Sequence, residues 1–182
     1  MPHYRQVGEI PRKRHTQFRQ PDGSLYAEEL MGEEGFNYDS ALLYHRHLPT
    51  ELVAIEGVES ETQEATPNHP LLPRHFRTHE LKTGGDAVSG RHLLMLNEDC
   101  QISYAAVGET SPLTKNATGD EMVFIESGSA RLESTFGALD AGPGDYVIVP
   151  ASTIHRWVVE AGETVRMLIL ETRAHIGPPR RY

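Results

Sequence analysis

Cysteine is almost absent from this chain of 182 residues, because Cys100 is the only one. No disulfide can therefore form within the chain, and cysteine usage of this kind favours a reducing compartment. Long apolar runs are absent as well: no stretch approaches the roughly 20 apolar residues that a transmembrane helix requires. The first residues also lack the apolar core of a signal peptide. We therefore expect a soluble, cytoplasmic protein with no membrane partner.

Positive charge is scarce. The chain has 17 Lys and Arg residues against 26 Asp and Glu, which gives a formal net charge of -9. Nucleic acid is therefore not expected as a partner, since no basic face offsets the acidic excess. A nucleophile elbow, a phosphate-cradling glycine loop and a Cys-His-Asn spacing are also missing, which argues against a Ser or Cys hydrolase.

Glycine and proline are well represented, with 16 and 12 residues, and they separate short apolar runs between His92 and Glu171. Short runs of alternating polarity closed by Gly or Pro are typical of antiparallel strands joined by tight turns. The predicted strands are residues 93–96, 102–107, 122–126, 130–136, 146–149, 155–159 and 165–171. Strands at this spacing indicate an all-β sandwich or barrel in which helix is a small minority.

The rest of the chain is interpreted around this barrel. Residues 1–50 form an N-terminal extended arm that needs a surface to pack on, either its own barrel or a neighbouring subunit. Its aromatic anchors are Tyr4, Phe18, Tyr26, Phe36 and Tyr44. Residues 51–172 are assigned to the barrel. Residues 173–182 are Pro-rich and basic, and we interpret them as a connector to a C-terminal barrel that this sequence does not contain.

Two stretches inside the barrel share a spacing with a known fold. Glu121 is followed by six residues and then Gly128. Gly144 is followed by five residues and then Pro150, and four more residues separate Pro150 from His155. These spacings resemble the two motifs of the cupins, small β-barrels that hold a metal ion on three histidines and a glutamate. We therefore expect a cupin-type antiparallel β-barrel, also called a jelly roll.

The metal positions of that motif are only half kept. Thr114 and Asn116 stand where the first two histidines are expected, and Ser152 replaces the second glycine of the second motif. Fe(II), Mn(II) and Zn(II) normally need three protein donors of imidazole, carboxylate or thiolate type. Glu121 and His155 are thus vestigial positions, expected to form hydrogen bonds inside the barrel. We assign no catalytic, cofactor-binding or metal-binding residue to this chain.

A separate His-x-His pair, His45 and His47, is followed by three residues and then Glu51. Alternate residues of a strand share a face, so both imidazoles could meet one ion. However, Pro49 breaks any strand directly after the pair, and surface or interface histidines are favoured. A third group of histidines lies in a Pro-interrupted loop without the Cys or carboxylate spacing of a zinc site. These are His69, His75 and His79.

Several longer segments resemble one family in particular. They are residues 4–17, 25–36, 40–45, 67–71, 116–121, 136–150 and 155–157. In this order they are similar to the N-terminal half of bacterial-type homogentisate 1,2-dioxygenases, and the resemblance is collinear over essentially the whole chain. Members of that family are two-barrel proteins that assemble as hexamers, arranged as a dimer of trimers. They open the ring of homogentisate with O₂ to give maleylacetoacetate, in tyrosine and phenylalanine breakdown.

The resemblance implies where the chemistry of such a protein lies. In the family, two histidines and one glutamate of the second barrel hold Fe(II), so no residue of this chain is carried over as an iron ligand. The expected function is therefore that of the structural half, inactive by itself. One alternative is a stand-alone, metal-free cupin that acts as a binding or scaffold module. Another is a small metal-dependent cupin enzyme that uses His45, His47 and Glu51. A reading frame that continues past Tyr182 into a second barrel would favour the first interpretation.

Overall fold

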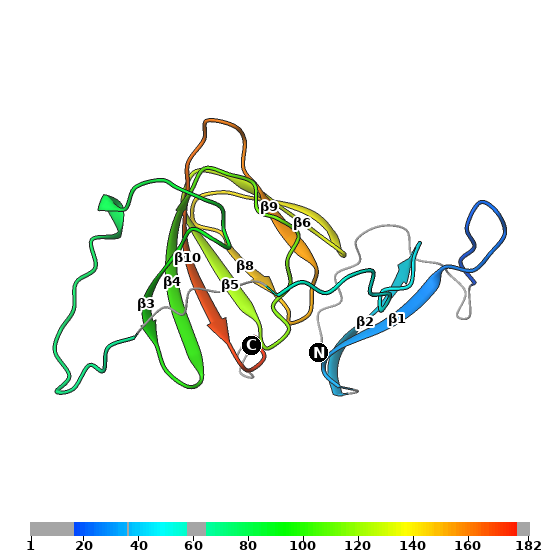
Figure 1. Ribbon diagram of the computed structural model, residues 1–182, viewed down its shortest axis with the longest axis horizontal. Coiled ribbons are helices and arrows are strands. Elements are labelled where there is room, and N and C mark those ends of the chain that lie inside the picture. The colour runs from blue at the N-terminus through cyan, green and yellow to red at the C-terminus, as the bar shows by residue number, and fades with distance from the viewer. Residues whose placement is uncertain (1–16, 36, 58–64, 178–182) are drawn as a thin grey trace. The chain divides into compact units, whose positions relative to one another are not determined.

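The computed structural model describes residues 17–35, 37–57 and 65–177 (Figure 1). The chain divides into two compact units, Met1–Val58 and Glu59–Tyr182, and each is described by itself. Three of the predicted features lie outside the described residues. They are the anchors Tyr4 and Phe36 and the last five residues of the predicted connector.

The first unit contains a β-hairpin. Strand β1 (Ala27–Glu34) pairs antiparallel with β2 (Asn37–His45), and the register brings Leu30 opposite Leu42. The rings of Phe18 and Tyr44, both among the predicted anchors, lie 4.6 Å apart. The segment predicted as an extended arm therefore holds a regular pair of strands. Its packing against a barrel or a second subunit stays a prediction.

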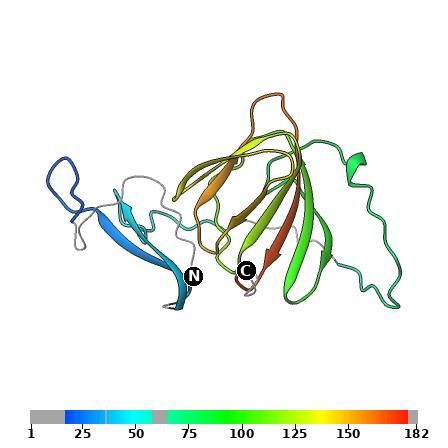
Figure 2. The same ribbon diagram turned by 180° about the vertical axis from the view of Figure 1, so that it is seen from behind.

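The second unit is built from two antiparallel sheets (Figures 1 and 2). The five-stranded sheet has the order β3 (Arg91–Leu96), β4 (Cys100–Val107), β10 (Val165–Thr172), β5 (Glu121–Ser127) and β8 (Tyr146–Val149). The three-stranded sheet has the order β7 (Gly137–Ala141), β6 (Ala130–Ser134) and β9 (His155–Val158). The prediction of an all-β, antiparallel barrel is confirmed.

Helix is minimal, as predicted. Among the described residues, it consists of one 3-10 turn, η1 (Thr78–Glu80). No helix in that part of the chain is long and apolar enough to cross a membrane.

The core lies between the two sheets and follows from the alternation of the sequence. In β5 and β10 every second side chain is buried, so Val123 and Ile125 face Met167 and Ile169 across the register of the sheet. Trp157 of β9 closes the core from the other sheet and is fully buried. Burying such side chains stabilises the fold by about 1.5–3 kcal/mol each. The core therefore fixes which residues of β5, β9 and β10 point into the barrel.

Two turns show why the motif spacing holds. Gly128, which ends the first motif, has a φ of +78°, and a Cβ there would lie 2.3 Å from the carbonyl oxygen of Thr164. Ser152, which stands in place of the second glycine of the second motif, has a φ of 66°. It thus adopts the left-handed conformation that normally favours glycine.

One strand of the barrel was not predicted. The sequence indicated a single strand over residues 130–136, but β6 ends at Ser134 and a turn leads into β7 at Gly137. Gly137 has a φ of +113°, which explains how the chain reverses directly after an apparently continuous strand pattern. The hairpin that results places β7 at the edge of the three-stranded sheet.

Candidate functional site

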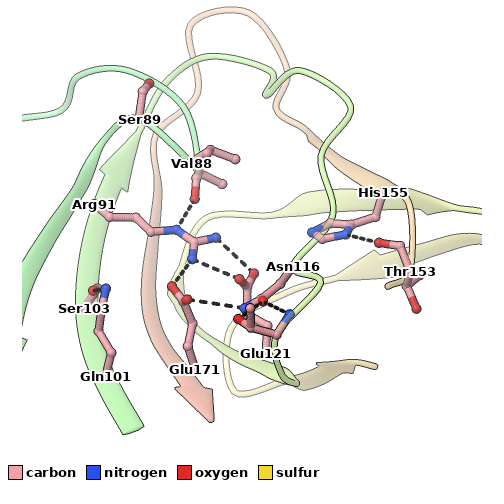
Figure 3. A network of polar contacts seen from close by, with 12 residues as sticks. Val88, Ser89, Arg91, Gln101, Ser103, Asn116, Glu121, Thr153, His155 and Glu171 are labelled. Carbon is pink, nitrogen blue, oxygen red and sulfur yellow. Dashed lines mark hydrogen bonds and ion pairs between the residues drawn. The ribbon is translucent and has the colours of Figure 1, made fainter. Parts of the chain in front are cut away.

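The vestigial motif positions line one cavity of about 380 Å³ inside the second unit. Its walls are Val88, Arg91, residues 114–118, Glu121, His155 and Glu171. Glu121 begins β5, His155 begins β9 and Glu171 lies near the end of β10. Since β5 and β10 are antiparallel, their register brings Glu121 directly opposite Glu171. Two carboxylates that lie far apart in the sequence therefore meet at this end of the barrel (Figure 3).

An arginine occupies the space between these carboxylates (Figure 3). Arg91 Nη1 and Nη2 donate to the two oxygens of Glu121 at 2.9 and 3.0 Å, and Nη1 also donates to Glu171 Oε1 at 2.5 Å. Nε donates to the carbonyl oxygen of Ala87 at 2.6 Å. The side chains of Arg91, Glu121 and Glu171 are 13%, 4% and 26% exposed. We call Arg91, Glu121 and Glu171 the arginine cluster.

The turn before β3 positions the side chain of Arg91 in the cavity. Asp86 Oδ1 accepts hydrogen bonds from the backbone N–H groups of Val88 and Ser89, at 2.6 and 3.2 Å. Burial raises the pKa of Asp86, but these bonds and the one from the Ser89 hydroxyl outweigh it and hold the pKa below its usual value. The short, ordered turn places the Ala87 carbonyl where Arg91 Nε can reach it.

Electrostatics favour the charged guanidinium. Burial lowers the pKa of Arg91, but the charges and hydrogen bonds of Glu121 and Glu171 outweigh burial and raise the pKa above its usual value. One guanidinium thus faces two carboxylates. Asn116 Nδ2 adds a hydrogen bond to Glu171 Oε2 at 3.3 Å.

His155 lies beside the cluster with one ring nitrogen unsatisfied. Its side chain is buried, and Nδ1 lies 3.0 Å from the carbonyl oxygen of Thr153. A carbonyl only accepts, so Nδ1 carries the proton. The other nitrogen, Nε2, faces the interior and has no hydrogen-bond partner among the described residues (Figure 3). His155 is held in place by backbone bonds to Thr114 in both directions, at 2.8 and 2.9 Å.

The residues in place of the missing histidines shape the loop. Asn116 Oδ1 accepts from the backbone N–H and the hydroxyl of Thr118, at 2.9 and 2.8 Å. Asn116 O accepts from Ser152 N at 2.6 Å, which joins the loop to the turn of the second motif. Together with the Thr114–His155 bridge, these bonds tie the loop to β9 and to the turn of the second motif.

The other candidate histidines are not brought together. β2 ends at His45, two residues before His47 and earlier than the predicted break at Pro49, and His45 Nε2 lies 2.7 Å from Glu29 Oε2. His47 lies beyond the strand, and Glu51 is exposed. The loop histidines 69, 75 and 79 are exposed too. In the described part of the chain, no three His, Cys, Asp or Glu residues form a group that could hold a metal ion.

Fe(II), which the family resemblance implies for two-barrel members, does not fit the donors of this barrel. Both oxygens of Glu121 are taken by Arg91, and Thr114 and Asn116 offer neutral oxygens. Of the four motif positions, only His155 still offers an atom that could bind a metal ion, its Nε2. A single imidazole is too few donors for a divalent transition metal.

A match to a known protein family agrees with this architecture. Residues 102–171 match the family described as "Cupin domain". The barrel has the cupin fold. Among solved structures, a "putative mannose-6-phosphate isomerase" from Ralstonia eutropha is 25% identical with a TM-score of 0.48 over 55% of this chain and 98% of that one. A cupin superfamily protein from Desulfitobacterium hafniense is 20% identical with a TM-score of 0.46, over 56% and 94%.

One curated relative matches almost the whole chain. "Putative dioxygenase SSO1533" of Saccharolobus solfataricus is 33% identical over 181 residues, which are 98% of this chain and 46% of the relative. The chain therefore spans about half the length of the protein that it matches. The match includes the hairpin unit as well as the cupin barrel.

Proposed function

We propose that this chain is the structural half of a two-barrel dioxygenase that opens the ring of homogentisate with O₂ to give maleylacetoacetate. In this proposal, Fe(II) and the reacting groups belong to a second barrel. The similarity to a protein named as a dioxygenase, which is about twice as long, supports the class of reaction. The choice of homogentisate rests on the collinear sequence segments described above.

The proposal rests mainly on one observation: the guanidinium of Arg91 binds both carboxylate oxygens of Glu121. Ring opening by a non-haem iron enzyme needs Fe(II) with protein donors on one face and open positions for substrate and O₂. In this barrel the one motif carboxylate makes a bidentate bond to a guanidinium instead. The motif carboxylate of this barrel is thus engaged in an ion pair, which suits a part that supports a catalytic partner.

The test compares the chain alone with a two-barrel polypeptide. We expect that the purified 182-residue chain, loaded with Fe(II) under anaerobic conditions, consumes no O₂ when homogentisate is added. The same chain followed by a second barrel in one polypeptide is expected to consume one O₂ per homogentisate and to form the ring-opened product. Ring cleavage by the 182-residue chain would overturn the proposal. If the two-barrel polypeptide is inactive, the result would instead favour the alternative that this chain is a metal-free cupin acting as a scaffold.

The proposal also includes a homo-oligomer, the trimer or hexamer that the family resemblance implies. An apolar face on the outside of the five-stranded sheet supports it. Tyr146 and Ile148 of the edge strand β8 are 64% and 44% exposed and lie opposite Phe124 and Met122 of β5. The rings of Phe124 and Tyr146 are 4.7 Å apart. Exposed apolar faces of this kind often mark contacts between subunits.

Replacing Ile148 by Glu in the two-barrel protein is expected to shift the sedimentation profile from the oligomer toward the monomer. The reason is that a charge would be buried without a partner in the contact. Phe136→Glu is the matched control, because Phe136 is 48% exposed in the turn between β6 and β7 of the other sheet. If both variants sediment like the parent oligomer, this face of the sheet is not the contact.

A further inference from the structure

We propose that this barrel contains a guanidinium-binding site, formed by Glu121, Glu171 and the Ala87 carbonyl, and that Arg91 is its built-in occupant. The guanidinium takes over the structural role that a metal ion has in metal-holding cupins. The inference stands on the geometry of the barrel and does not depend on the proposed dioxygenase function.

The site is complementary to a planar fork of N–H donors. Two parallel bonds join the guanidinium to Glu121, a third reaches Glu171, and Nε binds the carbonyl of Ala87. Bidentate bonds of this kind are stronger and more specific in direction than contacts to a point charge. Both the guanidinium and Glu121 are nearly buried, so solvent screens the pair little.

The position of the two glutamates explains why a cation is needed. Glu121 and Glu171 are direct cross-strand partners in the register of β5 and β10. Like charges directly opposite each other destabilise a sheet. A single cation that contacts both carboxylates removes this repulsion, which is also what a metal ion would do there.

The guanidinium also ties together strands that are not neighbours. In the sheet order, β4 and then β10 and β5 follow β3. Arg91 starts on β3, passes β4, and binds β10 and β5 through Glu171 and Glu121. Its side chain therefore joins three strands, β3, β10 and β5, at the end of the barrel where the motif residues lie (Figure 3).

The test removes the tethered guanidinium and adds a free one. We expect Arg91→Ala to lower the melting temperature of the purified chain by about 8 °C, because two opposed carboxylates lose their cation. Guanidinium chloride at low millimolar concentration, far below denaturing levels, is expected to restore about half of this loss. Tetramethylammonium chloride at the same concentration controls for ionic strength and is expected to restore nothing. The double variant Arg91→Ala/Glu121→Gln is expected not to respond to guanidinium.

Arg131→Ala is the matched control. Arg131 also makes two bonds to a carboxylate, Asp140, at 2.6 and 3.1 Å, but this pair is exposed on the surface. Exposed pairs contribute little to stability. We therefore expect no measurable change in its melting temperature and no response to guanidinium.

Arg91→Lys provides a second test, which keeps a positive charge and suits the case in which Arg91→Ala does not fold. Lysine lacks the planar set of N–H donors that arginine has, so the melting temperature of the Arg91→Lys variant is expected to lie about 4 °C below that of the parent chain. A lysine variant as stable as the parent chain would overturn the proposal. So would a loss of stability in Arg91→Ala that guanidinium restores no better than tetramethylammonium.

Discussion

Gly119→Ala is expected to lower the melting temperature of the cupin barrel by about 12 °C, which corresponds to about 4 kcal/mol of unfolding free energy. A Cβ at Gly119 would lie 1.5 Å from the carbonyl oxygen of Thr172 and 2.6 Å from its carbonyl carbon. Both are backbone atoms at the end of β10, so no side-chain rotation can relieve the overlap. The start of β5 and the end of β10 would have to separate.

The separation would also disturb the arginine cluster. Glu121 lies two residues after Gly119, and Glu171 precedes Thr172. Gly84→Ala serves as the control, because a Cβ there would meet nothing within 4 Å. Thermal unfolding followed by circular dichroism measures both variants. If Gly119→Ala has the same melting temperature as the parent chain, Gly119 does not lie as close to the backbone of Thr172 as the structure shows.

The sequence predicted the barrel because its core strands have regular alternation and turn residues with a clear steric role. β5 and β10 were located to within a residue or two, since their apolar side chains alternate and Gly128 ends the motif. Glu121 and His155, the two motif positions that the sequence retains, lie on different strands, and both are buried. β7 was not predicted, because its burial pattern is almost uniformly exposed and gives no alternation.

The binding of Glu121 and Glu171 by Arg91 could not be predicted in the same way. Arg91 lies 30 residues before Glu121, and Glu171 lies 50 residues after it, with no motif spacing between them. Only the pairing of β3, β4, β10 and β5 brings them together. One signal was present in the sequence: a motif glutamate without its histidines needs another cation if it is buried. Which side chain supplies this cation depends on the register of the sheet.

Asp120→Ala is expected to release the segment that follows the last strand and to cost about 3 kcal/mol of unfolding free energy. The Asp120 carboxylate is buried and accepts three hydrogen bonds. Oδ1 accepts from the backbone N–H of Ala151 at 2.9 Å. Oδ2 accepts from the backbone N–H of Ile176 at 2.7 Å and lies 3.1 Å from His175 Nδ1. Alanine would leave two backbone donors without their acceptor.

Hydrogen exchange measures this release directly. In the parent chain the amide of Ile176 is expected to be protected, and in Asp120→Ala it is expected to exchange as fast as an open loop. Asp120→Asn should give an intermediate result, because its single amide oxygen can replace only one of the two acceptors. Asp140→Ala is the control, since the exposed carboxylate of Asp140 binds Arg131 on the surface. Unchanged protection of Ile176 in Asp120→Ala would mean that Asp120 does not hold this segment. If the protection is lost, Asp120, the residue beside Glu121, holds the segment around Ile176 against the start of β5.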